Sequence, residues 1–113
     1  FGKRFFERTG KMPNMVHAGT YSSVMQYLKA IEKAGTDETE AVAKALHEMP
    51  VDDFFARNGK VGANGRMIHD MYLLQVKKPG ESDEPWDYFN VLSTIPGDEA
   101  YIDPAKSGCE LVK

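Results

Sequence analysis

Three histidines are the first side chains in this sequence to test for catalysis or metal binding. His17, His47 and His69 are far apart along the chain, and none has the neighbours of a known catalytic or metal-binding motif. In an extended segment His69 and Asp70 point to opposite faces, so the pair cannot chelate one ion without a turn between them. His47 falls near the C-terminal end of an expected helix, where a partial positive charge is favourable. We interpret His47 and His69 as structural or solvent-facing, and we expect no bound metal or cofactor.

The possible nucleophiles also lack the surroundings that catalysis requires. Ser22 and Ser23 are without the glycine-flanked turn, and without the following acid and histidine, of a serine hydrolase. Cys109 is the single cysteine, so it has no second thiol for a disulfide, and no flanking base or helix start is present to activate it. The glycines that follow Gly59-Lys60 do not form the Gly-Lys-Ser/Thr pattern of a phosphate loop. These residues therefore predict a protein that is not an enzyme.

The start of one expected helix is a better place for a ligand. His17, Ala18 and Tyr21 fall in its first turns, where unsatisfied amides and the positive end of the helix dipole favour an anionic group. A ligand carboxylate could approach there. The alternative is that Tyr21 is a core aromatic residue on the helix face. The residues alone leave this choice open.

Two helices must position this region. Apolar residues repeat at intervals of three and four, which predicts a helix over about residues 17–34 that ends at Gly35. The residues of this stripe are Tyr21, Val24, Met25, Leu28 and Ile31. Asp37, with Glu40 three residues later, predicts the capped start of a second helix that runs to about Met49.

The first residues resemble the end of a further helix. Phe1, Phe5 and Phe6 have near-helical spacing, and Gly10 follows as at a helix C-terminus. The first residue is not a methionine and already belongs to an apolar face. We therefore expect the chain to be a C-terminal fragment of a longer protein.

Beyond residue 57 the pattern becomes that of β-structure. Asn58-Gly59 and Asn64-Gly65 tolerate the positive φ angles of tight turns. Alternation over residues 71–77 and 89–95 predicts two strands, the first with one well-buried face. We expect the tail after the second strand to be irregular. Two helices followed by two or three strands would leave both helices poorly covered, so a partner surface is expected to be missing.

Composition argues against two classes of partner. The 113 residues are 42% hydrophobic and 27% charged, the ordinary balance of a globular protein. The net charge is −3, and the scattered lysines give no basic stripe, so we expect no nucleic-acid partner. No apolar run reaches the roughly 20 residues that a bilayer span requires.

Four segments resemble the type I periplasmic solute-binding proteins of branched-chain amino-acid ABC transporters. They are MPNMVHAGTYSSVMQYLKAIEKAGTDETEAVAKAL, FFARNGKVGANGRMIHDMYLLQVKKP, PWDYFNVLSTIPGDEAY and the terminal SGCELVK. The resemblance covers essentially all of the chain. It implies an α/β fold of two lobes, each a mainly parallel sheet flanked by helices, joined by three crossover strands and closing by hinge motion. Residues 1–66 would complete the N-terminal lobe, and residues 67–113 would carry the third crossover, near 67–73, and strands and tail of the C-terminal lobe.

The same resemblance implies a function without bond chemistry. The protein would capture a small organic solute between its lobes in the periplasm and deliver it to the membrane permease of an ABC transporter. The solute would be a branched-chain or other amino acid, or an aromatic or other small carboxylate. Val16, His17 and Tyr21 are the ligand-binding positions that the resemblance implies. Val16 would be an apolar wall, and His17 a polar or aromatic one where branched-chain binders often have a plainer aromatic residue.

Two other functions stay open on the sequence. A ligand-sensing regulatory domain can use the same fold, and an effector domain upstream would distinguish it. A small free-standing α+β enzyme would need a pocket that brings His17 or His69 to an acidic partner. The incomplete lobes should expose apolar surface, so we also expect the isolated segment to self-associate through helix faces or swapped strands.

Overall fold

The computed structural model describes residues 1–84 and 86–112, and its first half is helical. The helices are α1 (Gly2–Thr9), α2 (Met15–Ala34) and α3 (Thr39–Glu48). α1 and α2 end as the glycine pattern predicts, because Gly10 and Gly35 both adopt the left-handed conformation with φ of 68°. α2 begins two residues earlier than the apolar repeat indicates, at a cap formed by Asn14.

The start of α3 corrects one sequence prediction. The cap is Glu38 and not Asp37, since the Glu38 carboxylate accepts hydrogen bonds from the amides of Glu40 and Ala41 at 3.1 and 2.9 Å. These two hydrogen bonds lower the pKa of Glu38 below its ordinary value, because they favour the charged form. A longer side chain one residue further along reaches the amides that Asp37 was expected to reach.

Two antiparallel pairs of strands follow the helices. They are a short hairpin of β1 (Lys60–Val61) with β2 (Met67–Ile68), and a longer ribbon of β3 (Met71–Val76) with β4 (Phe89–Ile95). The predicted turns are confirmed, because Asn58 and Gly65 have φ of 53° and 74°. The register of the ribbon shifts between Leu73 and Leu74, which pair with Ser93 and Val91, so a bulge interrupts the ladder at Leu92.

The hydrophobic core of the described residues is small and lies between α2 and α3. Ala30, Val42 and Ala45 are buried there. The predicted apolar stripe of α2 is not the buried face: Tyr21 and Leu28 are 47% and 52% exposed. All residues of β3 are exposed as well, so its expected buried face is wrong for this chain. The periodicity marks the apolar residues of α2 and β3, but in the described part these faces remain largely open to solvent.

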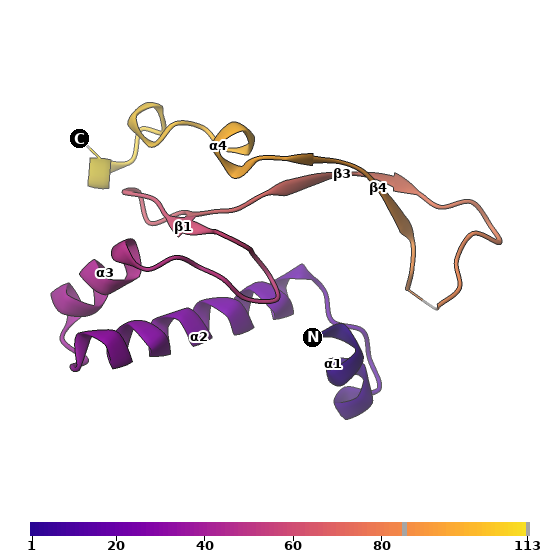
Figure 1. Ribbon diagram of the computed structural model, residues 1–113, viewed down its shortest axis with the longest axis horizontal. Helices are drawn as coiled ribbons and strands as arrows, with labels where there is room; N and C mark the ends of the chain where they lie inside the picture. Colours follow the sequence, from indigo (N-terminus) through magenta and orange to yellow (C-terminus); the bar gives the residue numbers. More distant parts are fainter. Residues whose placement is uncertain (85, 113) are drawn as a thin grey trace.

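After β4 the chain returns to the β1–β2 hairpin. Figure 1 shows β4 running back along β3, with α4 (Gly97–Ala100) and the C-terminal end on the same side of the molecule as β1. The Gly97 amide donates to Asp70 Oδ1 at 3.0 Å, and Lys60 pairs with Asp98 at 2.6 Å. The described part of the tail, up to residue 112, then holds two 3₁₀ turns, η1 (Pro104–Lys106) and η2 (Glu110–Val112). We call the contacts of Gly97 and Asp98 with Asp70 and Lys60 the C-terminal clasp.

Candidate functional site

The first turn of α2 is already capped by its own side chains. Asn14 Oδ1 accepts from the amides of Val16 and His17 at 3.0 and 3.2 Å, and the Ala18 amide donates to the Asn14 carbonyl at 3.3 Å. The ring of His17 completes a capping box, because its Nδ1 accepts from the Asn14 amide at 3.2 Å. The expectation of unsatisfied amides at the start of this helix is therefore wrong for His17 and Ala18. A carboxylate that bound nearby would need another partner.

The three predicted site residues lie along one hollow. Its volume is about 430 Å³, and its lining is almost wholly apolar. The lining residues are Phe1, Phe5, Val16, His17, Thr20, Tyr21, Val24 and Met25. Phe5 contacts the His17 ring edge to face, with centroids 5.1 Å apart. The structure thus brings Val16, His17 and Tyr21 together, with an aromatic wall from α1.

Phe54 is an aromatic residue beside this hollow that sequence reasoning missed. Its ring stacks on Phe1 with centroids 4.6 Å apart and meets the edge of Tyr21 at 5.6 Å. Phe54 is nevertheless 44% exposed, so part of its ring is free. It lies in an irregular segment, 33 positions after Tyr21 in the sequence. No periodicity could have indicated the contact.

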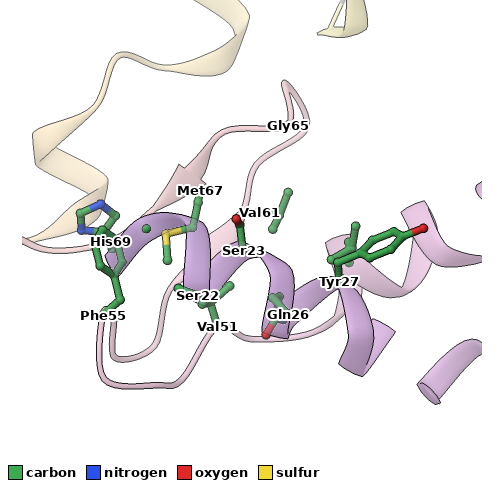
Figure 2. A pocket seen from close by; sticks show the side chains of 12 residues that line it. Ser22, Ser23, Gln26, Tyr27, Val51, Phe55, Val61, Gly65, Met67 and His69 are labelled. Atoms are coloured by element: carbon green, nitrogen blue, oxygen red, sulfur yellow. The ribbon is translucent and has the colours of Figure 1, made fainter. Parts of the chain in front are cut away.

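A second hollow, of about 390 Å³, lies between α2 and the β1–β2 hairpin. Figure 2 shows Phe55 and His69 at one end of it and Tyr27 at the other. The polar side chains on its wall are already hydrogen-bonded: Ser22 donates to Asp53, Gln26 to the Pro50 carbonyl and Ser23 to the Thr20 carbonyl. Ser22 has a carboxylate and not a histidine as its partner, which does not match a nucleophile with its base.

His69 and His47 have structural partners. His69 contacts the Asp70 carbonyl through Nδ1 and the Tyr101 hydroxyl through Nε2, both at 2.8 Å. Burial raises the pKa of Tyr101 despite the opposing charge of Arg66, so the phenol stays protonated at neutral pH. His47 Nδ1 lies 3.3 Å from the Val61 carbonyl and links α3 to the hairpin. Within residues 1–84 and 86–112 no group of three or more acidic, histidine or cysteine side chains is placed to hold a metal ion.

The segment from Val51 to Gly59 forms a closed loop that rests on α2. Val51 and Gly59 exchange two backbone hydrogen bonds, at 2.7 and 2.9 Å. Inside the loop Asp53 accepts from the Ser22 hydroxyl at 2.5 Å and from the amides of Phe55 and Ala56 at 2.7 and 3.0 Å. Partial burial by itself raises the pKa of Asp53, but these hydrogen bonds and the charge of Lys29 outweigh it, so the pKa is lowered.

A third hollow lies between the tip of this loop and the base of the β3–β4 ribbon. Its volume is about 260 Å³, and its lining is more polar than that of the other two. The lining residues are Phe54, Phe55, Ala56, Arg57, His69, Asp70, Tyr72 and Thr94. Asp70 uses Oδ1 to accept from the Gly97 amide. Arg57 forms no hydrogen bond or ion pair with any residue that the structure describes.

Comparisons with known proteins identify the family. Residues 1–82 match the family of periplasmic binding proteins, and the chain belongs to it. A periplasmic binding protein from Burkholderia mallei is 46% identical, with a TM-score of 0.92 over 99% of this chain. A branched chain amino acid ABC transporter periplasmic ligand-binding protein from Burkholderia xenovorans LB400 is 38% identical, with a TM-score of 0.91 over 99% of this chain. No curated protein matches the chain.

These comparisons also fix the fold class. The chain spans 30% of the length of each of the two solved structures, so it corresponds to part of a periplasmic binding protein fold. The predicted α/β class and the predicted resemblance are both confirmed. None of the helices in the described part is both long and apolar enough to cross a membrane.

Proposed function

We propose that this chain is part of the solute-binding component of an ABC transporter. It would capture a small organic solute in the periplasm and deliver it to a membrane permease, without changing any bond of the solute. Membership of the periplasmic binding protein family is the observation that carries this proposal. The ligand-binding protein of a branched-chain amino-acid transporter, 38% identical, supports it. The solute class is an amino acid, or an aromatic or other small carboxylate.

We place the boundary between two lobes at the start of the ribbon. Residues 1–66 would belong to the N-terminal lobe, and the third crossover would begin at about residue 67, with the rest of the chain directed to the C-terminal lobe. The ribbon supports this division, because β3 and β4 extend away from the helices (Figure 1). Through the contacts of the C-terminal clasp, the segment after β4 returns to residues 60–70.

Val16, His17 and Tyr21 are proposed to contact the solute. Val16 is 65% exposed and offers an apolar wall, and Tyr21 offers a half-exposed ring held against Phe1 and Phe54. His17 uses Nδ1 in the helix cap, whereas its Nε2 has no partner among the described residues. An imidazole fixed in this way can present one nitrogen to a ligand at little cost in conformational entropy.

The test is a titration of the mature protein expressed from the source gene. The protein is unfolded and refolded to remove any solute that co-purifies, and calorimetry then measures affinity for amino acids and for aromatic and other small carboxylates. His17→Ala and Tyr21→Ala should each weaken binding about tenfold or more, since a buried aromatic contact at a binding site is typically worth that much.

Tyr27→Ala is the matched control for Tyr21→Ala. Both tyrosines lie on α2 and both are 47% exposed, but Tyr27 is not part of the hollow that holds Val16 and His17. Tyr27→Ala should change the affinity for the solute by less than about twofold. A refolded wild-type protein that binds none of these solutes would contradict the proposed function.

A further inference from the structure

The Val51–Gly59 loop is held at its two ends, at Asp53 and at Ala56. Its ends are joined by two backbone hydrogen bonds. Asp53 accepts hydrogen bonds from two amides of the same loop and from the Ser22 hydroxyl on α2. Ala56 is 6% exposed and anchors the second half. Between these anchors Phe54 and Arg57 remain exposed. Loops that are held rigid while their tips stay open commonly carry binding residues.

The tip of this loop carries a permanent cation, whereas no lysine or arginine of the described residues lines the first hollow. The amides of Val16 and His17 are taken by Asn14, so they offer nothing to a carboxylate. Arg57 is a permanent cation without a partner in the described residues, and it lines the third hollow together with Phe54. A guanidinium matches the two oxygens of a carboxylate, which is why arginine suits the recognition of this group.

The third hollow lies between the loop and the base of the ribbon. Its walls come from the loop and from Tyr72 of β3 and Thr94 of β4 at the base of the ribbon. Under the proposed division these walls belong to the N-terminal lobe and to the strands that leave it. Phe54 connects this hollow to the first one, because its ring contacts both Phe1 and Tyr21.

We propose that the tip of the Val51–Gly59 loop is part of the solute site, with Arg57 pairing with a carboxylate of the solute and Phe54 packing against its apolar part. The solute class is thereby narrowed to small carboxylates with an apolar group. Ser22 and Asp53 are positioning residues, because they hold the loop and do not themselves face the third hollow. This inference rests on the proposed function.

The experiment compares each acid that the refolded mature protein binds with its carboxamide, which has nearly the same shape but lacks the negative charge of the carboxylate. Arg57→Gln should weaken binding of the acid by about ten- to a hundredfold, since a hydrogen bond to a charged group is worth that much. Binding of the carboxamide should change less than about threefold. Arg57→Lys should recover part of the loss, because it restores the charge without the planar fork.

Two further variants test Phe54 and its support. Phe54→Ala should weaken binding, and Phe54→Leu should restore affinity for aliphatic carboxylates more than for aromatic ones. Ser22→Ala should lower the ratio of acid to carboxamide affinity, and Ser22→Thr, which keeps the hydroxyl, should restore that ratio. Lys44→Gln on α3 removes a cation whose side chain is 77% exposed and should have no effect.

The outcomes separate this inference from the proposed function. If the wild type binds a solute and His17→Ala weakens it, but Arg57→Gln affects acid and carboxamide equally, the inference is overturned and the proposed function stands. A Ser22→Ala protein with an unchanged affinity ratio would overturn the positioning role. If no solute binds the refolded wild type, both fail together.

Discussion

Asp53 is the residue on which the geometry of the candidate site depends. Its carboxylate accepts three hydrogen bonds, one from Ser22 on α2 and two from amides of its own loop. Ser22 is 3% exposed, so its hydroxyl would be left without a partner if the carboxylate were removed. Leaving a buried donor unsatisfied costs more than the net gain of an ordinary hydrogen bond. One side chain therefore fixes the segment that places Phe54 beside Tyr21.

Asp53→Ala should lower the free energy of unfolding of the mature protein by about 1–3 kcal/mol at pH 7, as measured by urea unfolding. Asp52→Ala is the matched control, because Asp52 is exposed and has no partner in the described residues. The control should change stability by less than about 0.5 kcal/mol. Equal losses in both variants would contradict the role given to Asp53.

The stabilisation by Asp53 should also depend on pH. Its pKa is lower in the folded protein than the ordinary value of about 3.9, so the contribution is complete above that value. It is lost as the pH falls through the lowered folded-state pKa, because the carboxylate must then be protonated. The gap in stability between wild type and Asp53→Ala should therefore shrink below about pH 4. A gap that stays constant down to acid unfolding would show that the charge is not responsible.

At the scale of elements, α1 and the loop of the ribbon are joined by two contacts of different strength. Lys3 and Glu84 form an ion pair at 3.2 Å, but their side chains are 75% and 49% exposed. Phe6 and Trp86 pack with ring centroids 4.9 Å apart. An exposed ion pair contributes only about 0–1 kcal/mol to stability, because solvent screens it. An aromatic pair contributes about 0.5–1.5 kcal/mol in addition to the stabilisation from the apolar area that it buries. The aromatic pair should therefore dominate.

Trp86→Ala should release the ribbon loop from α1, while Lys3→Ala should leave it in place. Amide hydrogen exchange over residues 77–84 measures this, and exchange should accelerate much more in the tryptophan variant than in the lysine variant. Lys3→Ala should show a small effect that disappears at high salt, because screening already removes the ion pair there. Faster exchange in Lys3→Ala than in Trp86→Ala would reverse the ranking of the two contacts.

The C-terminal clasp depends on the absence of a side chain at Gly97. A Cβ at this position would lie 3.0 Å from the carbonyl carbon and oxygen of His69 and 3.1 Å from Ile68 Cγ2. Gly97→Ala should therefore destabilise the folded mature protein by about 1–3 kcal/mol and lower its melting temperature. Gly2→Ala is the control, since its Cβ would meet only Met12 at 3.9 Å and alanine favours the helix. An unchanged melting temperature in Gly97→Ala would contradict this role, because it would mean that the neighbouring backbone can move to make room for the methyl group.

The molecule as a whole exposes more surface than a compact chain of its size. Its accessible area is 8544 Å², whereas a compact monomer of 12.6 kDa exposes about 6,200 Å². The radius of gyration is 17.0 Å, against about 13 Å for a compact domain of this length. Much of the difference is apolar, because the α2 stripe and both strands of the ribbon are open. These faces are open to solvent in the described residues.

The isolated 113-residue chain should accordingly self-associate. Analytical ultracentrifugation over a range of concentrations should show dimers or larger species, because burial of the α2 stripe removes apolar surface from water. Leu28→Glu places a charge in that stripe, where Leu28 is 52% exposed, and should shift the chain toward monomer. Glu32→Gln, at an exposed position of the same helix, is the control. A monomeric mass at high concentration would contradict this prediction.

The sequence by itself determined the local elements. The ends of α1 and α2 follow from Gly10 and Gly35, and the hairpin turns follow from Asn58 and Gly65, because each depends on backbone conformation within a few residues. The strands over residues 71–76 and 89–95 follow from alternation in the same way. His17 and Tyr21 could be placed side by side from the sequence, since residues four apart lie on one face of a helix, whereas Val16 lay outside the helix predicted over residues 17–34.

Only the tertiary structure decided which distant residues complete the site. Phe54 reaches Tyr21, and Asp53 reaches Ser22, across more than 30 positions, and no local pattern encodes such a contact. The buried face of α2 likewise could not be predicted from the sequence, because periodicity marks apolar residues but does not indicate which surface covers them. Ser22 and Gln26 are buried where Leu28 is not, since the neighbours that α2 has in this chain lie on its polar side.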